Sequence, residues 1–213
     1  ITVKSGGKII TGPNGKIIFD PNKSITVEGN AEIKGFTNNK LSLEFSNSTA
    51  VGVEAQFGSN LSISNCIIKN AIVGIKVENG STANISYVDF TDCSDNAVVM
   101  FGFGNGENAQ SLPTPTVYRC TIENSSTEIS VVNYDQLVLK ENTINHCNLG
   151  IFLNMVNSAY ITSNTILGWQ SATGSPMPGI SISNGGGYIR NNIIRYHNFG
   201  VLLAYASPDL GVN

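Results

Sequence analysis

A six-residue block that returns at a nearly constant interval is the feature of the sequence that most restricts its fold. Six segments align without gaps, and each begins with Ile, Leu or Val and closes with Ile or Phe. They are ISNCII (63–68), ISYVDF (85–90), VYRCTI (117–122), LKENTI (139–144), ITSNTI (161–166) and IRNNII (189–194). Three of the five intervals between their starts are equal, and the other two are longer. The basic period is therefore about 22 residues, with longer connections inserted twice.

A second block follows the first and shows the alternation of a β-strand. Each repeat carries two apolar residues separated by one residue, and the pairs are Ile75/Val77, Ala97/Val99, Ile129/Val131, Ile151/Leu153, Ile180/Ile182 and Val201/Leu203. Alternation with a period of two is typical of strands, and no long segment shows helical periodicity. A 22-residue repeat that holds three short strands predicts an all-β parallel β-helix. Insertions near 101–116 and 169–178 interrupt its coils.

The fourth position of the six-residue block predicts a row of asparagines inside a bend. This position is occupied in order by Cys66, Val88, Cys120, Asn142, Asn164 and Asn192. Equivalent residues of stacked coils lie about 4.8 Å apart, so each amide can donate to the oxygen of the next coil. We therefore expect Asn142, Asn164 and Asn192 to form an asparagine ladder, a row of amides hydrogen-bonded from coil to coil.

The N-terminal segment has a shorter rhythm, because isoleucines recur at every eighth position from Ile1 to Ile33, with turn-forming residues between them. Three such units make about one coil, so residues 1–45 are expected to be the tightly wound start of the same solenoid. Residues 46–213 continue it as regular coils, which makes the whole chain, 1–213, one domain. The last repeat ends without another six-residue block, and we expect the coils to continue in a longer protein.

Composition excludes several classes of function. Charged residues make up 13% of the chain and the net charge is −3, whereas binding to nucleic acid requires clustered Lys and Arg. An apolar content of 41% argues against disorder. No run of 18 apolar residues is present, so we expect no membrane-spanning segment.

The four cysteines are evenly spaced along the chain, but the repeat separates them into two rows. Cys66 and Cys120 share one position of the repeat, whereas Cys93 and Cys147 share another. A whole coil intervenes within each pair, which gives a separation of roughly 9.6 Å. A disulfide needs Cα atoms closer than about 7 Å, so four free thiols are expected.

Two groups of residues resemble reactive sites. Lys140, Glu141, His146 and Cys147 lie within eight positions, but a nucleophile and its base normally come from separate segments, so we interpret the group as solvated turns. Asp89, Asp92 and Asp95 are spaced as weak candidates for a Ca²⁺ site. They lie across a bend and need not converge, so no metal or other cofactor is expected.

The coils of the form GI-x-L followed by I-x-x-N-x-I resemble the right-handed parallel β-helix of the pectin-lyase-like superfamily. GIFL (150–153) with ITSNTI and GISI (179–182) with IRNNII carry the resemblance, which covers most of the chain. The superfamily includes polysaccharide lyases and hydrolases, phage tailspikes, adhesins and bacterial surface proteins. The opening segment, ITVKSGGKIITGPNGKIIFDPNKSITVEG, looks most like the surface proteins.

Catalysis in such enzymes is expected on the outer face of the sheet that carries the GI-x-L strands. The outward residues there are predicted to be Lys76, Val98, Ser130, Phe152, Ser181 and Leu202. This row offers one base and no acid, which is a poor set for acid–base chemistry, so no catalytic residue is assigned.

The same face predicts a surface for a partner. Its expected members are Val98, Met100, Phe101, Phe103, Phe152 and Trp169. Exposed apolar patches with aromatic residues often bind a protein or a polysaccharide. The alternative is that the two insertions fold back and cover the patch.

The sequence therefore predicts a non-enzymatic, extracellular or cell-surface scaffold, stalk or adhesin-like module. The alternative is a fragment of a carbohydrate-active enzyme or a sugar-binding module.

Overall fold

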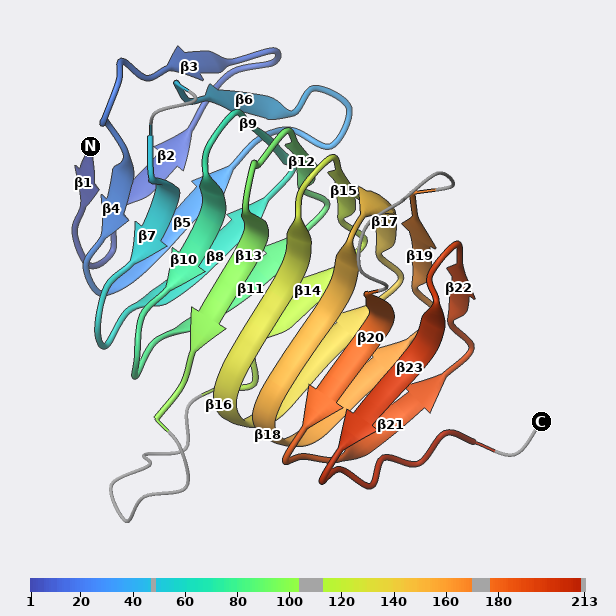
Figure 1. Ribbon diagram of the computed structural model, residues 1–213. Helices are drawn as coiled ribbons and strands as arrows, with labels where there is room; N and C mark the ends of the chain where they lie inside the picture. The colour runs from blue at the N-terminus through green and yellow to red at the C-terminus, as the bar shows by residue number, and fades with distance from the viewer. Residues whose placement is uncertain (47–48, 104–112, 170–176, 212–213) are drawn as a thin grey trace.

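The computed structural model describes residues 1–46, 49–103, 113–169 and 177–211, which form a right-handed parallel β-helix (Figure 1). No helix occurs among these residues. Each coil passes through a front face, a second face and a third face. Each strand pairs in parallel with strands of the neighbouring coils. The fold class predicted from the 22-residue repeat is confirmed.

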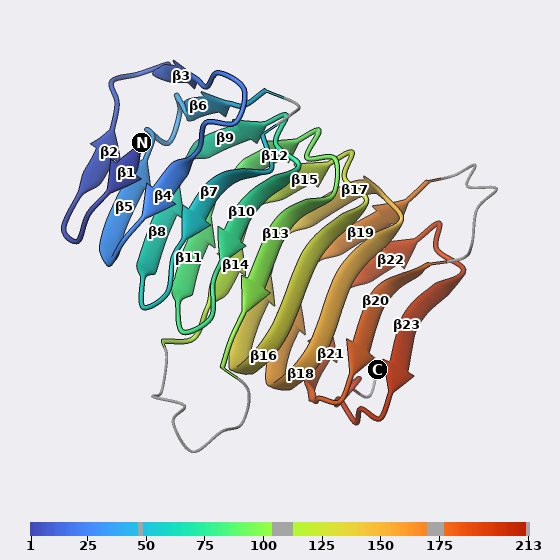
Figure 2. The ribbon, with the colours of Figure 1, turned by 60° about the vertical axis from the view of Figure 1, so that its left-hand side comes forward.

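The strands divide among the three faces as follows. The front face holds β1 (Thr2–Val3), β4 (Ile25–Val27), β7 (Val51–Ala55), β10 (Val73–Val77), β13 (Asn96–Phe101), the first half of β16 (Thr127–Lys140), the first half of β18 (Leu149–Thr162), β20 (Pro178–Ser183) and β23 (Phe199–Ala204). The second face holds β2 (Lys8–Ile10), β5 (Asn30–Lys34), β8 (Asn60–Ser64), β11 (Thr82–Ser86), β14 (Thr116–Tyr118), the second halves of β16 and β18, and β21 (Gly187–Arg190). The third face holds β3 (Lys16–Ile18), β6 (Leu41–Glu44), β9 (Cys66–Lys69), β12 (Asp89–Thr91), β15 (Thr121–Glu123), β17 (Thr143–Cys147), β19 (Thr165–Gly168) and β22 (Ile193–Arg195). Figure 2 shows β16 and β18 bending from the front face into the second face, which joins these two faces into one sheet.

The first residues of the six-residue blocks form one buried ladder. Strand pairing places them in register from coil to coil, and none is more than 6% exposed; they are Ile63, Ile85, Val117, Leu139, Ile161 and Ile189. Each block is not a single strand but spans the corner between the second and third faces. The third residue of each block has a positive φ and turns the chain; these residues are Asn65, Tyr87, Arg119, Glu141, Ser163 and Asn191.

The three asparagines line the inside of this corner as a ladder. Nδ2 of Asn142 donates to Oδ1 of Asn164 over 2.9 Å, and Nδ2 of Asn164 donates to Oδ1 of Asn192 over 2.9 Å. The same oxygens accept the backbone N–H groups of Asn142 and Asn164. Asn142 and Asn164 are each 1% exposed. These bonds satisfy polar groups that would otherwise be buried without partners.

The first two coils, the two insertions and one extra residue in the turn before β13 account for the departures from a 22-residue period. Thr2 pairs with Thr26 and Ile25 pairs with Val53, so the first two coils are both longer than the 22 residues of the basic period. The added length elsewhere lies between β13 and β14 and between β19 and β20. Residues 104–112 and 170–176 of those connections lie outside the described residues.

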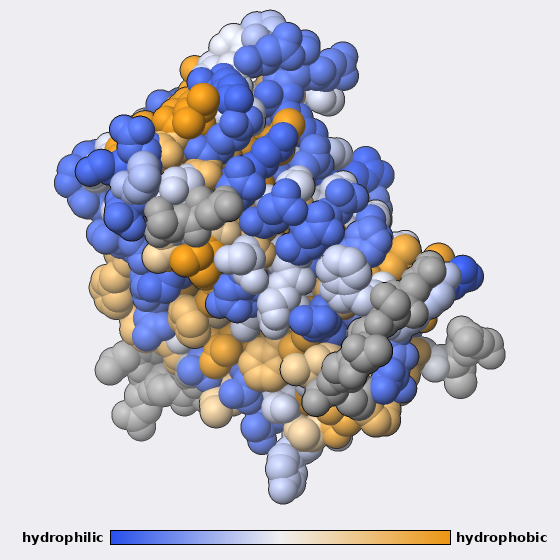
Figure 3. All heavy atoms as spheres, turned by 45° about the horizontal axis from the view of Figure 1, so that its top comes forward, coloured by the Kyte–Doolittle hydropathy of each residue, from blue (hydrophilic) through white to orange (hydrophobic). Residues whose placement is uncertain are grey.

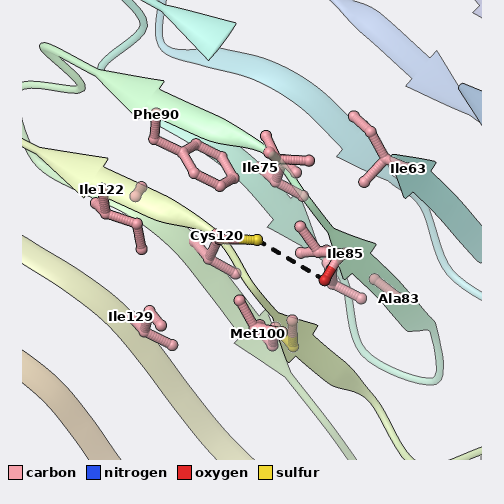
Figure 4. Close-up of a cluster of buried hydrophobic side chains, with 14 of the residues drawn as sticks. Ile63, Ile75, Ala83, Ile85, Phe90, Met100, Cys120, Ile122 and Ile129 are labelled. Atoms are coloured by element: carbon pink, nitrogen blue, oxygen red, sulfur yellow. Dashed lines mark hydrogen bonds between the residues drawn. The ribbon is translucent and has the colours of Figure 1, made fainter. Parts of the chain in front are cut away.

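The register of β13 differs from the predicted one, because the turn before this strand holds one extra residue. Phe90 pairs with Ile68 at the ordinary interval of the repeat, but the partner of Asn96 is Val73 and not Gly74. The alternation of β13 is therefore shifted by one position, so Val98 and Met100 face the interior and are 0% exposed. The prediction that these two belong to an outer surface is wrong. Figure 4 shows Met100 among the buried side chains, near Ile129 and Cys120.

The four thiols are free and buried. Val88 occupies the position between Cys66 and Cys120, and Ser125 the position between Cys93 and Cys147. Burial raises the pKa of Cys66, Cys93 and Cys120 to about 12 in each case. These cysteines act as small interior side chains.

Candidate interaction surfaces

The outward row of the front face combines one charged cluster with an apolar centre. Strand pairing places these residues side by side: Glu54, Lys76, Val99, Ser130, Phe152, Ser181 and Leu202. Nζ of Lys76 pairs with Glu54 over 3.3 Å and with Glu78. Its hydrogen bond with Glu78, supported by Glu54, raises the pKa of Lys76. Figure 3 shows apolar side chains gathered in the lower half of the view, below a mostly polar upper half.

The remaining members of the predicted partner surface do not form one continuous patch. Phe101 and Phe152 are half-buried on the outer side of the front face. Phe103 packs edge-on against Phe57, with ring centroids 5.6 Å apart. Trp169 is 43% exposed and lies over His146, with ring centroids 5.0 Å apart. The aromatic residues beside the insertions therefore contact neighbours of their own.

The residues around 140–147 divide between two corners of the coil. Lys140 and Glu141 lie at the corner between the second and third faces, whereas His146 and Cys147 end β17 at the next corner. Sγ of Cys147 lies 3.8 Å from Nε2 of His197, a contact that the sequence did not suggest. Burial raises the pKa of Cys147 and lowers that of His197. A thiol that is 1% exposed and holds its proton is unsuited to nucleophilic chemistry.

The three aspartates of the calcium hypothesis have separate surroundings. Asp89 pairs with Nζ of Lys40 over 2.6 Å, and Oδ1 of Asp92 accepts a hydrogen bond from Nδ2 of Asn124 over 3.0 Å. Asp95 is exposed. Asp92 and Asn124 line a hollow of about 380 Å³ with Asn70, Ala71 and Ser94. Among the described residues, no group of three or more His, Cys, Asp or Glu side chains is arranged to hold a metal ion.

Aromatic and basic side chains form a diagonal band across the second face and its corner with the third face. We define the tyrosine–arginine strip by eight residues: Tyr87, Tyr118, Arg119, Lys140, Glu141, Tyr160, Tyr188 and Arg190. Pairing of β11, β14, β16, β18 and β21 brings them together on successive coils. Tyr87, at one end of the strip, and Tyr160 and Tyr188, at the other end, are 37–41% exposed.

The strip has two clusters of contacting aromatic and basic side chains. In the first, the rings of Tyr87 and Tyr118 meet edge-on at 5.7 Å, and the guanidinium of Arg119 lies 5.9 Å and 5.0 Å from their respective centroids. In the second, Tyr160 and Tyr188 stack with centroids 5.2 Å apart and an angle of 22°. Arg190 lies 5.4 Å from the centre of the Tyr188 ring. Such contacts restrict the exposed side chains to defined positions.

Ion pairs fix the basic groups of the strip. Nε of Arg119 donates to Glu141 over 2.6 Å, and Nη1 donates to the hydroxyl of Tyr87 over 3.2 Å. The hydrogen bond from Arg119, together with one from Lys140, lowers the pKa of Glu141. Arg190 pairs with Asp209, whose pKa is lowered first by the backbone N–H of Gly211 and then by Arg190.

A buried carboxyl group lies inside the corner between the third and front faces. Glu128 is 0% exposed and occupies the position that other repeats fill with Gly74 and Gly150. Oε1 accepts the backbone N–H of Ser125 over 3.2 Å, whereas Oε2 has no protein partner. Burial raises the pKa of Glu128 to about 7.

Sequence reasoning missed both the strip and Glu128, although each leaves a signal. Tyr160 and Tyr188 directly precede the first residue of their six-residue blocks, so the repeat places them one coil apart. Glu128 replaces glycine in an otherwise small-residue row.

A family model described as a right-handed beta helix region matches residues 43–169. Comparisons with curated proteins and with solved structures gave no significant match. Among the described residues, no helix is long and apolar enough to cross a membrane.

Proposed function

We propose that this chain, which belongs to the right-handed β-helix family, is a non-enzymatic interaction module of an extracellular or cell-surface protein. In this role the solenoid is a stalk or adhesin-like scaffold, and its outer faces bind a protein or polysaccharide partner. The location outside the cell rests on the resemblance of the opening segment to bacterial surface proteins.

The outward row of the front face carries this proposal. Cleavage of a polysaccharide requires an acid and a base, or a carboxyl pair, placed to reach one sugar linkage. The charged groups of the row are confined to one end, where Lys76 is paired with both Glu54 and Glu78. The centre and the other end of the row hold Val99, Phe152 and Leu202, separated by serines. Such a row favours contact with a partner over acid–base chemistry.

Two measurements on the natural source and on the purified chain test the proposal. An antibody against residues 1–213 should label intact cells or the culture medium, because the module is expected outside the cell. The purified chain should release no new reducing ends or unsaturated products from a panel of neutral and anionic polysaccharides. Confinement of the protein to the cell interior, or catalytic cleavage of any polysaccharide, would contradict the proposal.

A further inference from the structure

We propose that the tyrosine–arginine strip is the docking surface for an acidic, extended segment of a partner protein. This inference rests on the proposed role as an interaction module and assigns that role a surface and a partner chemistry. The strip lies on the second face and its corner with the third face, away from the outward row of the front face.

The shape of the strip fits an elongated partner. It crosses five adjacent strands, from β11 to β21. Strands in a sheet are about 4.8 Å apart, so the strip is about 19 Å long, which is the length of roughly six residues of extended chain. A segment of that length can contact each coil in turn.

The orientation of the rings decides which chemistry the strip presents. The face of Tyr160 is covered by Tyr188, and the face of Tyr188 also has Arg190 over it. Arg119 lies over both Tyr87 and Tyr118. Each of the four rings therefore has a neighbour over at least one face, which reduces the ring area that is free to stack on a flat sugar ring. Ring edges carry partial positive charge, and together with hydroxyl and guanidinium donors they favour carboxylates.

The charge of the strip agrees with an acidic partner. Arg119, Lys140 and Arg190 are opposed by Glu141 and Asp209, which is three positive charges against two negative charges. The whole chain, in contrast, has a net charge of −3. The strip together with Asp209 therefore has a net charge of +1, which favours acidic segments over basic ones.

The residue types agree with a protein partner. Tyr and Arg carry much of the binding energy in protein interfaces, particularly where their side chains are already ordered. Here stacking and ion pairing hold these side chains before any partner arrives. Binding therefore costs less conformational entropy than at a surface of free side chains.

The test measures binding of a fluorescent 12-residue peptide of alternating Glu and Gly, with a Gln-for-Glu peptide and a soluble polyglucuronate chain as comparisons. Two substitutions use residues that other coils carry at the same positions. Arg119→Asn copies Asn65 and Asn191, which share its positive φ, and Tyr188→Thr copies Thr116 of the same row. Arg195→Asn, on the third face, removes a positive charge elsewhere.

We expect the Glu peptide to bind in a salt-sensitive manner and each strip variant to weaken it by about tenfold. The control variant and the wild type should agree within about twofold, and the Gln peptide should not bind. Equal binding by wild type and both strip variants would overturn the proposal. Binding of polyglucuronate but not of the peptide at the strip would overturn it in favour of a glycan partner. Neither result would alter the outcome of the localisation and cleavage tests, so the two proposals fail separately.

Discussion

Nδ2 of Asn142 donates a hydrogen bond to Oδ1 of Asn164 across 2.9 Å, and this contact repeats from coil to coil inside the corner beneath the tyrosine–arginine strip. The ladder fixes the corner at which Arg119 and Glu141 turn outward. Order in the exposed strip therefore depends on order in the buried amides.

Replacing Asn164 by Leu should destabilise the protein. The backbone N–H of Asn142 and the carbonyl of Leu139 would lose their partners in a buried site. Each buried polar group left without a hydrogen-bond partner costs about 1–3 kcal/mol. Urea unfolding should show this loss, whereas Asn192→Leu, at the half-exposed end of the ladder, should cost less. Equal midpoints for Asn164→Leu and wild type would show that the ladder does not stabilise the coils.

Glu128 should make stability depend on pH in a defined direction. Its pKa in the folded protein is raised to about 7 from the ordinary 4.5. A raised carboxyl pKa means that the folded state binds the proton more tightly, so stability is lost as pH rises from about 4.5 through about 7.

The variant Glu128→Gln isolates this effect from other groups that titrate in the same range, such as His197. The stability of the variant relative to wild type should increase by up to about 3 kcal/mol between pH 5 and pH 8. Denaturant titrations at both pH values provide the measurement. If the difference in unfolding free energy between the variant and the wild type does not change with pH, Glu128 is not a neutral, buried carboxyl group.

The thiols should be unreactive until the protein unfolds. All four are buried, and burial raises their pKa, so little thiolate is present at pH 8. Alkylation without reductant, followed by mass spectrometry, should find no modified cysteine in the native protein and four in denaturant. Fewer than four in denaturant would indicate a disulfide and a different stacking of the coils.

The shifted register of β13 predicts that two adjacent positions differ in how well they tolerate a polar substitution. Val98 is buried in the core, whereas Val99 lies on the outer side beside Ser130. Val98→Ser should cost about 2 kcal/mol or more, because it removes packing and buries a hydroxyl. Val99→Ser should cost less than Val98→Ser, because Val99 points outward and stays outside the core cluster although only 9% of it is exposed. Thermal unfolding compares them, and the reverse order would restore the register expected from a strict 22-residue period.

Much of the fold could be predicted because stacked coils repeat the same side-chain pattern. Ile63 and Ile85 occupy equivalent positions in their blocks, and this equivalence is also their spatial register. The extra residue between Thr91 and Asn96 could not be found in this way, since lengthening a turn by a single residue leaves no mark on the alternation itself.

The candidate surfaces were less accessible to sequence reasoning. The outward positions of Tyr160 and Tyr188 follow from the repeat, but their stacking depends on side-chain conformation. The placement of Arg119 over two rings depends on its ion pair with Glu141 from the next coil. No periodicity encodes either contact.

Zero-length carbodiimide cross-linking of the Glu peptide to the native chain tests the central claim most directly. The Nζ of Lys140 lies in the strip with its side chain 48% exposed, so a peptide docked there can form an amide with it. Peptide mapping by mass spectrometry should find Lys140 as the dominant cross-linked lysine, and Arg119→Asn should reduce that product. Cross-links spread evenly over lysines of other faces, such as Lys16 and Lys76, would contradict an acidic-partner surface on the second face.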